Sequence, residues 1–175
     1  IEEAFARPST LLFHPYLYGS PHGPAASGAF LGLRGWHNRG DMLRAVLEGI
    51  AFNHRVHVDS LRNGFEISAA RLTGGISRNP LFAQLFADVL GMPVTVTETE
   101  EAAAWGAALC AGSGVNLFTS PQADPRKLEE IGKTYLPDAQ VCSRMNERYA
   151  LHCSAAETLS TIWPRIESLA PDNAR

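Results

Sequence analysis

The residues best suited to bind a ligand lie in the segment 71–80, which reads Arg-Leu-Thr-Gly-Gly-Ile-Ser-Arg-Asn-Pro. Gly74 and Gly75 permit positive φ and a close approach of the backbone to a ligand, and Asn79 offers an amide. Free N–H groups of the helix predicted to follow would point back at this turn. The spacing is neither GxGxxG nor GxxxxGK[ST], so the pattern alone favours a structural turn over a ligand site.

Histidines could hold a metal ion, and several occur in the first third of the chain. They are His14, His22, His37, His54 and His57. The last two are three residues apart on one predicted helix, but no HExxH pattern or converging set of carboxylates accompanies them. We therefore expect packed or solvated histidines and no metal site in this chain.

Acidic and cysteine side chains give no catalytic arrangement. Glu98, Glu100 and Glu101 could act as paired carboxylates, but at a helix start they more often serve the helix dipole. The cysteines are Cys110, Cys142 and Cys153. They lack CxxC spacing, so structural or incidental thiols in a reducing cytoplasm are favoured over a metal site. No GxSxG elbow or Ser/His/Asp set supports hydrolysis by a nucleophile.

Composition restricts the class of protein. The chain has 175 residues, of which 45% are hydrophobic and 19% charged, as expected for one soluble globular domain. Fifteen basic against eighteen acidic residues give a net charge of −3, which argues against nucleic acid as a partner. No apolar run is long enough to cross a membrane.

The sequence begins with Ile-Glu-Glu and has no initiator Met, so we expect a fragment, incomplete at its N-terminus.

The first forty residues are rich in proline and glycine and predict short strands near 11–13 and 29–31. Apolar residues at helical spacing then predict an amphipathic helix that Asp41 would cap and Gly64 would stop.

A strand–helix–strand–helix succession comes next and predicts an α/β fold. Its elements are a strand at 70–73, a helix at 80–90, a strand at 93–97 and a helix at 100–112. Asn79 can cap the first of these helices, Pro80 suits its first position, and Gly91 can end it. The second helix is rich in alanine and glycine, and so small a face would let it pack closely against a neighbour.

Residues 119–175 predict a mainly helical tail of the same domain. Ser120 and Asp124, each followed by proline, are candidate helix starts, and a polar helical stretch covers 143–170 with an interruption at Pro164. We expect this tail to serve packing and not chemistry. Its apolar residues could pack on the domain itself or form a homodimer.

Two stretches match one family in order and spacing. The first is Gly-Ala-Phe-Leu-Gly-Leu at 28–33, followed after seven residues by Asp-Met and then Ala-Val-Leu-Glu at 45–48. The second runs over 74–91 and continues with Pro-Val and Glu-Ala-Ala-Ala-Trp-Gly-Ala-Ala at 101–108. Together they resemble the C-terminal lobe of the FGGY carbohydrate kinases, which include xylulose, ribulose, gluconate and glycerol kinases. The resemblance covers about residues 11–118.

The resemblance implies that residues 1–175 form one actin-like, ribonuclease H-like α/β lobe of a sugar kinase. In such an enzyme a similar N-terminal lobe completes a cleft for ATP and a sugar or polyol, and the γ-phosphoryl group of MgATP passes to a hydroxyl. Gly75 and Asn79 correspond to family positions that contact the adenosine of ATP or ADP, and Gly74 and Ile76 form the adjoining turn. The free N–H groups at the start of a helix would by themselves favour binding of a phosphate at this turn. The resemblance implies that the turn binds the nucleoside instead.

Some family features differ or are missing. Ile76 stands where the family commonly has glycine or alanine. The segment Ser20-Pro21-His22 stands where many pentulose kinases have Gly-Glu-Arg. This difference resembles the L-xylulose kinase branch of the family. The resemblance implies a pentulose such as xylulose as the substrate. The catalytic aspartate, the phosphate-binding Gly-Thr loop and the aspartate for Mg²⁺ would all lie upstream.

These missing parts lead us to expect no kinase activity from this chain alone. The competing interpretation is a non-catalytic nucleotide-binding or interaction domain on the same fold, because fold alone does not decide function.

Overall fold

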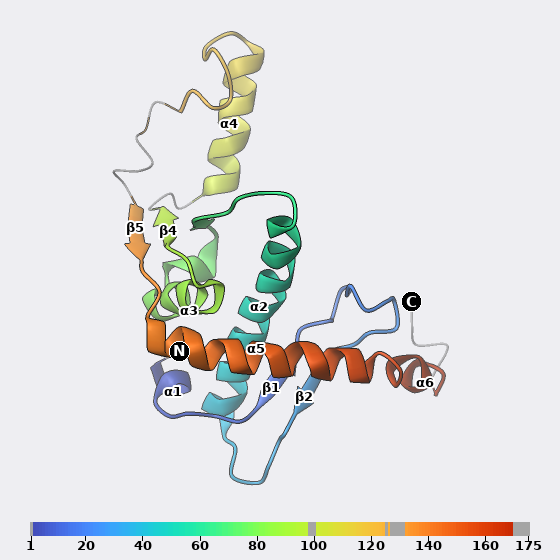
Figure 1. Ribbon diagram of the computed structural model, residues 1–175. Helices are drawn as coiled ribbons and strands as arrows, with labels where there is room; N and C mark the ends of the chain where they lie inside the picture. The colour runs from blue at the N-terminus through green and yellow to red at the C-terminus, as the bar shows by residue number, and fades with distance from the viewer. Residues whose placement is uncertain (1, 98–100, 125, 127–131, 170–175) are drawn as a thin grey trace.

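The computed structural model describes residues 2–97, 101–124, 126 and 132–169, and combines helices with two small sheets (Figure 1). The elements are α1 (Glu2–Phe5), β1 (Leu12–His14), β2 (Ala29–Leu31), α2 (Arg39–Arg62), β3 (Ala70–Leu72), the 3₁₀ helix η1 (Gly75–Arg78), α3 (Pro80–Leu90), β4 (Val94–Thr97), α4 (Ala102–Gly114), β5 (Gly132–Tyr135), α5 (Ala139–Leu159) and α6 (Trp163–Glu167). None of the helices in this described part combines the length and apolar character of a membrane span.

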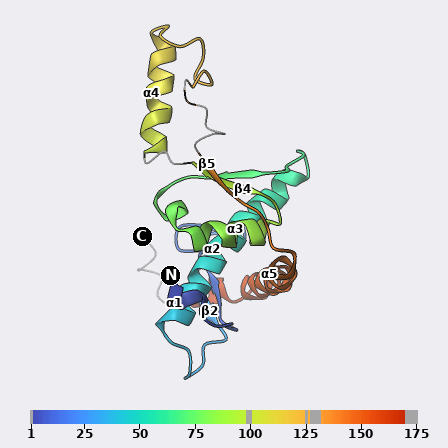
Figure 2. The same ribbon diagram turned by 90° about the vertical axis from the view of Figure 1, so that its left-hand side faces the viewer.

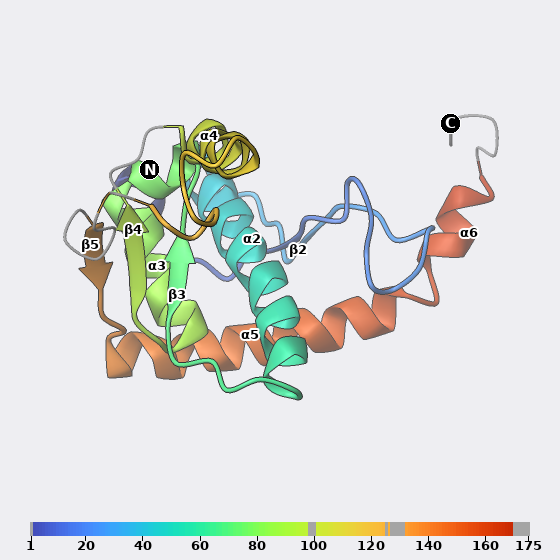
Figure 3. The same cartoon turned by 90° about the horizontal axis from the view of Figure 1, so that it is seen from above.

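The larger sheet has the order β3-β4-β5, with β3 and β4 parallel and β5 antiparallel to β4 (Figure 3). The register pairs Leu72 with Val96 and Thr97 with Gly132. Helix α3 connects β3 to β4 and packs against the sheet. This β3–α3–β4 unit confirms the predicted α/β class, and it brings the carboxyl ends of both parallel strands to one edge.

Helix α3 has the bounds and caps that its sequence predicts. The Oδ1 atom of Asn79 accepts hydrogen bonds from the backbone N–H groups of Leu81 (3.1 Å) and Phe82 (3.3 Å). Pro80 occupies the first turn, and Gly91 ends the helix in the left-handed conformation with φ +63°. These local signals determine where the turn before the helix must lie.

The main core lies between α2, α3, α5 and the larger sheet. Phe52 of α2, Phe82 and Val89 of α3, Val94 of β4 and Met145 of α5 are all buried there. Three helices thus meet one sheet, and the β3 end that carries the Gly-Gly turn is anchored on this core.

Helix α2 begins earlier than predicted, and its cap is Asn38 and not Asp41. The Asn38 side chain accepts from the Asp41 N–H (3.1 Å), while the Asp41 carboxylate accepts from the Asn38 N–H (2.9 Å). This reciprocal capping box makes Asp41 the third helical residue, and both members are good capping types, which explains the error. The helix ends at Arg62, with Asn63 as its C-cap and Gly64 just beyond.

The later part of the chain also departs from prediction. Strand β5 was not expected, α5 begins at Ala139 under an Asp138 cap, and the helical break lies at 160–162. Pro164 sits in the first turn of α6, where its missing N–H costs no hydrogen bond. Ser120 lies beside a turn, and the Asp124 carboxylate accepts from Arg126. Neither begins a described helix, because Ser-Pro and Asp-Pro also favour turns.

A buried carboxylate joins three distant segments. Glu48 of α2 is 1% exposed and accepts from the Nε atoms of Arg44 (2.7 Å) and of Arg148 on α5 (2.9 Å). Arg148 also donates to the carbonyl oxygens of Ser9 (2.7 Å) and Leu11 (2.9 Å). The N-terminal segment, α2 and α5 are therefore held by one charge-assisted network.

The predicted short strands near 11–13 and 29–31 are confirmed as the antiparallel pair β1–β2, which lies against α2 and α5. At its end His14 is fully buried, and its Nε2 donates to the carbonyl oxygen of His152 (2.9 Å). The two imidazole rings are 4.2 Å apart, and Tyr16 and Trp163 pack beside His14. Burial, reinforced by repulsion from His14 and His22, lowers the pKa of His152 to about 3. Burial lowers the pKa of His14 as well.

Replacing Glu48 with alanine should lower the free energy of unfolding by about 2–3 kcal/mol, because the partly buried guanidinium groups of Arg44 and Arg148 lose their shared carboxylate. Urea unfolding of the protein measures this loss. Glu147→Ala, an exposed change on α5, is the matched control and should cost less than about 0.5 kcal/mol. A cost below about 1 kcal/mol for Glu48→Ala would show that the network is dispensable.

Acid should destabilise the protein through the buried histidines. The unfolded chain binds a proton on each histidine below about pH 6.5, whereas folded His152 stays neutral down to about pH 3, so stability falls as the pH drops through this window. Replacing His152 with glutamine should reduce the loss of unfolding free energy between pH 7.5 and 5 by about 2 kcal/mol. His57→Gln, at an exposed position on α2, is the control. Equal acid losses in all three proteins would refute this role.

Candidate functional site

The candidate site is the turn between β3 and α3, at the carboxyl edge of the larger sheet. Gly74 has φ +103° and ψ 171°, a conformation that is essentially restricted to glycine. Residues Gly75–Arg78 then form η1, and Asn79 both ends η1 and caps α3. The chain thus reverses within a few residues and places the start of α3 directly behind the turn.

Hydrogen bonds inside the turn keep its shape. The Ser77 hydroxyl donates to the Gly74 carbonyl oxygen (2.6 Å), and the Ser77 N–H donates to the same oxygen (3.2 Å). The Asn79 N–H donates to the Ile76 carbonyl oxygen (3.1 Å). Ser77 is buried, so this set of bonds is sheltered from water and the outer surface of the turn is preorganised.

The outer surface of the turn is open. A Cβ atom added at Gly74 or Gly75 would meet no heavy atom within 4 Å, and the Ile76 side chain is 45% exposed. The Asn79 Oδ1 is used by the helix cap, but among the described residues its amide N–H₂ group has no partner. The backbone at Gly74 and Gly75 and the amide N–H₂ group of Asn79 are therefore available to a flat polar ligand.

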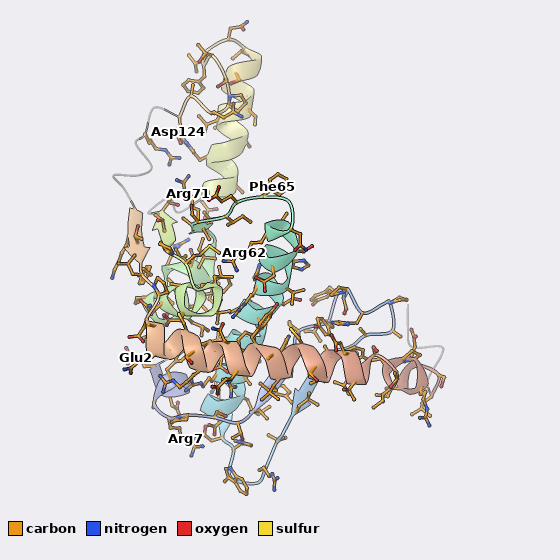
Figure 4. All side chains as sticks on the ribbon, viewed as in Figure 1. Glu2, Arg7, Arg62, Phe65, Arg71 and Asp124 are labelled. Carbon is orange, nitrogen blue, oxygen red and sulfur yellow. The ribbon has the colours of Figure 1, made fainter. Side chains whose placement is uncertain are left out.

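A cavity of about 200 Å³ lies beside the turn, between the strand ends and α4. Arg71 and Thr73 line it from β3 and its end, Thr97 from β4, and Trp105 from α4. Figure 4 shows Arg71 at this edge of the sheet and Asp124 on the segment that follows α4. The cavity and the turn share the β3 end, so a ligand on the turn can extend toward it.

An ordered polar group forms the outer wall of this cavity. Trp105 Nε1 donates to Asp124 Oδ2 (2.8 Å), and the Arg126 guanidinium lies over the indole, 4.1 Å from the ring centroid. Arg126 also pairs with Asp124 (2.8 Å), and this bond is the main cause of the lowered pKa of Asp124. These three residues were not predicted from the sequence, although a tryptophan within an alanine- and glycine-rich helix is a usable signal.

Helix α4 does not show the close packing that its small residues predict. Of its described residues only Leu109 and Gly112 are buried, and the helix projects from the rest of the chain (Figure 2). A Cβ at Gly112 would lie 2.6 Å from the Phe118 ring, so this glycine is needed for the turn that follows α4. Most of the other α4 residues are exposed, although Ala102, Trp105 and Gly106, which line the cavity, are partly buried.

The predicted site residues Gly74, Gly75, Ile76 and Asn79 share one turn, whereas the other candidates are scattered or outside the described part. Glu98 and Glu100 lie outside the described residues, and Glu101 precedes α4 without a side-chain cap bond. In the described ranges, no group of three metal-ligating side chains occurs, and the three cysteines are unpaired.

Comparison of the sequence with known families and proteins gives a consistent result. Residues 2–115 match the model of the FGGY family of carbohydrate kinases, C-terminal domain. The L-xylulose/3-keto-L-gulonate kinase of Escherichia coli (strain K12) is 30% identical over 158 residues, which are 90% of this chain and 32% of that protein. The chain therefore spans about a third of the length of this relative.

Solved structures agree with the sequence comparison. A ligand-bound xylulose kinase from Lactobacillus acidophilus aligns over 94% of this chain and 35% of its own, with a TM-score of 0.78 and 24% identity. A Plasmodium falciparum glycerol kinase with ADP aligns over 84% of this chain and 30% of its own, with a TM-score of 0.63 and 24% identity. The likeness shows the fold, and the predicted actin-like α/β lobe is confirmed.

Proposed function

Because the chain belongs to the FGGY family of carbohydrate kinases, we propose that it is the nucleotide-side lobe of an ATP-dependent carbohydrate kinase. The full-length protein would transfer the γ-phosphoryl group of MgATP to a hydroxyl of a sugar or polyol. The names of similar proteins, an L-xylulose/3-keto-L-gulonate kinase and a xylulose kinase, support a pentulose such as xylulose as substrate. Unpaired cysteines are consistent with the reducing cytoplasm as the proposed location.

The open turn at the end of β3 is the observation that carries this proposal. Gly74 and Gly75 leave room for a planar ring against the backbone, and the unpartnered Asn79 amide can donate to a ring or ribose acceptor. These residues fit an adenosine better than a phosphate, because the Asn79 Oδ1 already occupies two of the N–H groups at the start of α3. We therefore assign Gly74, Gly75, Ile76 and Asn79 to nucleoside binding.

Phosphoryl transfer needs groups beyond this turn. It depends on positioning of the phosphates and on neutralisation of charge in the transition state, and Mg²⁺ supplies part of that neutralisation when bound. We assign the catalytic aspartate, the phosphate loop and the metal site to the N-terminal lobe of the full-length protein. The 175-residue chain alone should show no sugar-dependent release of ADP from ATP, and such release would contradict this division of roles.

Replacing Gly75 with leucine in the full-length protein should raise the KM for ATP about tenfold or more, because the side chain would occupy the open surface of the turn. The KM for the sugar and the melting temperature should change little, since no neighbour lies within 4 Å of the new Cβ and Gly75 has no left-handed backbone. Steady-state kinetics with each substrate varied in turn provides the measurement.

Gly35→Leu is the matched control, because Gly35 is equally open but lies in the loop between β2 and α2. An unchanged ATP constant for Gly75→Leu would remove the turn from nucleotide binding. Asn79 is a poorer choice for this test, since its loss would also uncap α3 at a cost of about 1 kcal/mol.

A further inference from the structure

A second cavity, of about 300 Å³, lies at the end of the molecule opposite α4 and far from the candidate site. Its walls come from α1 and the following segment, from α2 and from the first half of α5. Figure 4 labels Arg7 at this end and Asp124 at the other. The turn between β3 and α3 does not contribute to this cavity, whereas the C-terminal tail contributes to it through α5.

Four arginines line this cavity, and none of its described lining residues is acidic. They are Arg7, Arg44, Arg144 and Arg148. Two carboxylates lie behind the wall, where Asp41 pairs with Arg7, and Glu48 is shared by the arginines of α2 and α5. Four positive charges against two negative ones leave the cavity with an excess of two positive charges.

Many guanidinium donors around the cavity are unused. A guanidinium has five N–H groups. Arg44 directs its Nε to Glu48 and one Nη to the Arg7 carbonyl oxygen (2.6 Å), so three N–H groups stay open. Within the described part of the chain Arg144 makes no hydrogen bond or ion pair at all, and it is exposed. It has no visible role in holding the fold, in contrast to Arg148.

The remaining lining is apolar. Met145 is buried at 4% exposure, and Phe5 and Val141 are partly buried beside it. The Arg44 guanidinium lies 5.5 Å from the Phe5 ring centroid. An apolar surface beside unpaired guanidinium groups suits a molecule that has a hydrocarbon or ring body and an oxyanion head.

We propose that this cavity is a binding site for a small organic anion, whose phosphate or carboxylate group Arg144 and Arg44 bind while its body rests on Phe5 and Met145. The volume is at the lower end for small-molecule sites, so the ligand is a compact one. The site is separate from the nucleotide-binding turn, and its existence does not depend on the proposed kinase reaction.

The test is calorimetric titration of the full-length protein with phenyl phosphate, benzoate and benzamide, with ADP present at saturation so that the nucleotide site is filled. Phenyl phosphate or benzoate should bind, and neutral benzamide should not. Whichever anion binds more tightly identifies the head group. Arg144→Gln should weaken that binding about tenfold, the effect of losing one charged contact. Arg165→Gln, on α6 outside this cavity, should leave it unchanged.

Three results would overturn the proposal. Absence of heat at millimolar anion would show that the cavity is not an anion-binding site. Equal binding of benzamide would show an apolar groove without an anion site. Unchanged affinity in Arg144→Gln would place any bound anion elsewhere on the protein. Arg144 has no described partner, so this variant should fold normally and each result should be clear.

Discussion

The ion pair of Glu48 with Arg148 is the constraint on which the arrangement of the chain depends. A carboxylate that is 1% exposed needs compensation for its lost hydration, and Arg148 provides it from a residue 100 positions away. The same guanidinium binds the carbonyl oxygens of Ser9 and Leu11, which puts the segment before β1 between α2 and α5. The His14–His152 contact lies along the same interface, so the position of α5 is specified by polar groups as well as by Met145.

Local signals account for what the sequence predicted well. Asn79, Pro80 and Gly91 act within one helix, so the bounds of α3 and the place of the Gly-Gly turn followed from nearest neighbours. The start of α2 was misplaced by a local ambiguity, because Asn38 and Asp41 are both able to cap and the structure uses them together. Strand β5 needed β4 as a partner, and its four residues give little signal alone.

In the candidate site, too, the residues within one short segment were predicted from the sequence, and those brought together from distant segments were not. Its four turn residues all lie within the short segment 74–79, and the family resemblance gave them a role that their spacing alone did not. The Trp105–Asp124–Arg126 group joins residues that are about twenty positions apart through side chains, and a pattern search within one element does not find such contacts. The arginine cavity is a further case, since its walls come from three elements and no motif connects them.

The exposed apolar surface of helix α4 bears on the form in which the chain would bind a nucleotide. Its residues are apolar or small on every side, a composition typical of a buried helix, yet only Leu109 and Gly112 are buried. Water therefore contacts a surface that this sequence is poorly suited to expose. The chain spans about a third of a relative whose full length forms the kinase, and α4 stands beside the candidate nucleotide turn. Covering α4 with the proposed N-terminal lobe would both bury this surface and close the cavity next to the turn.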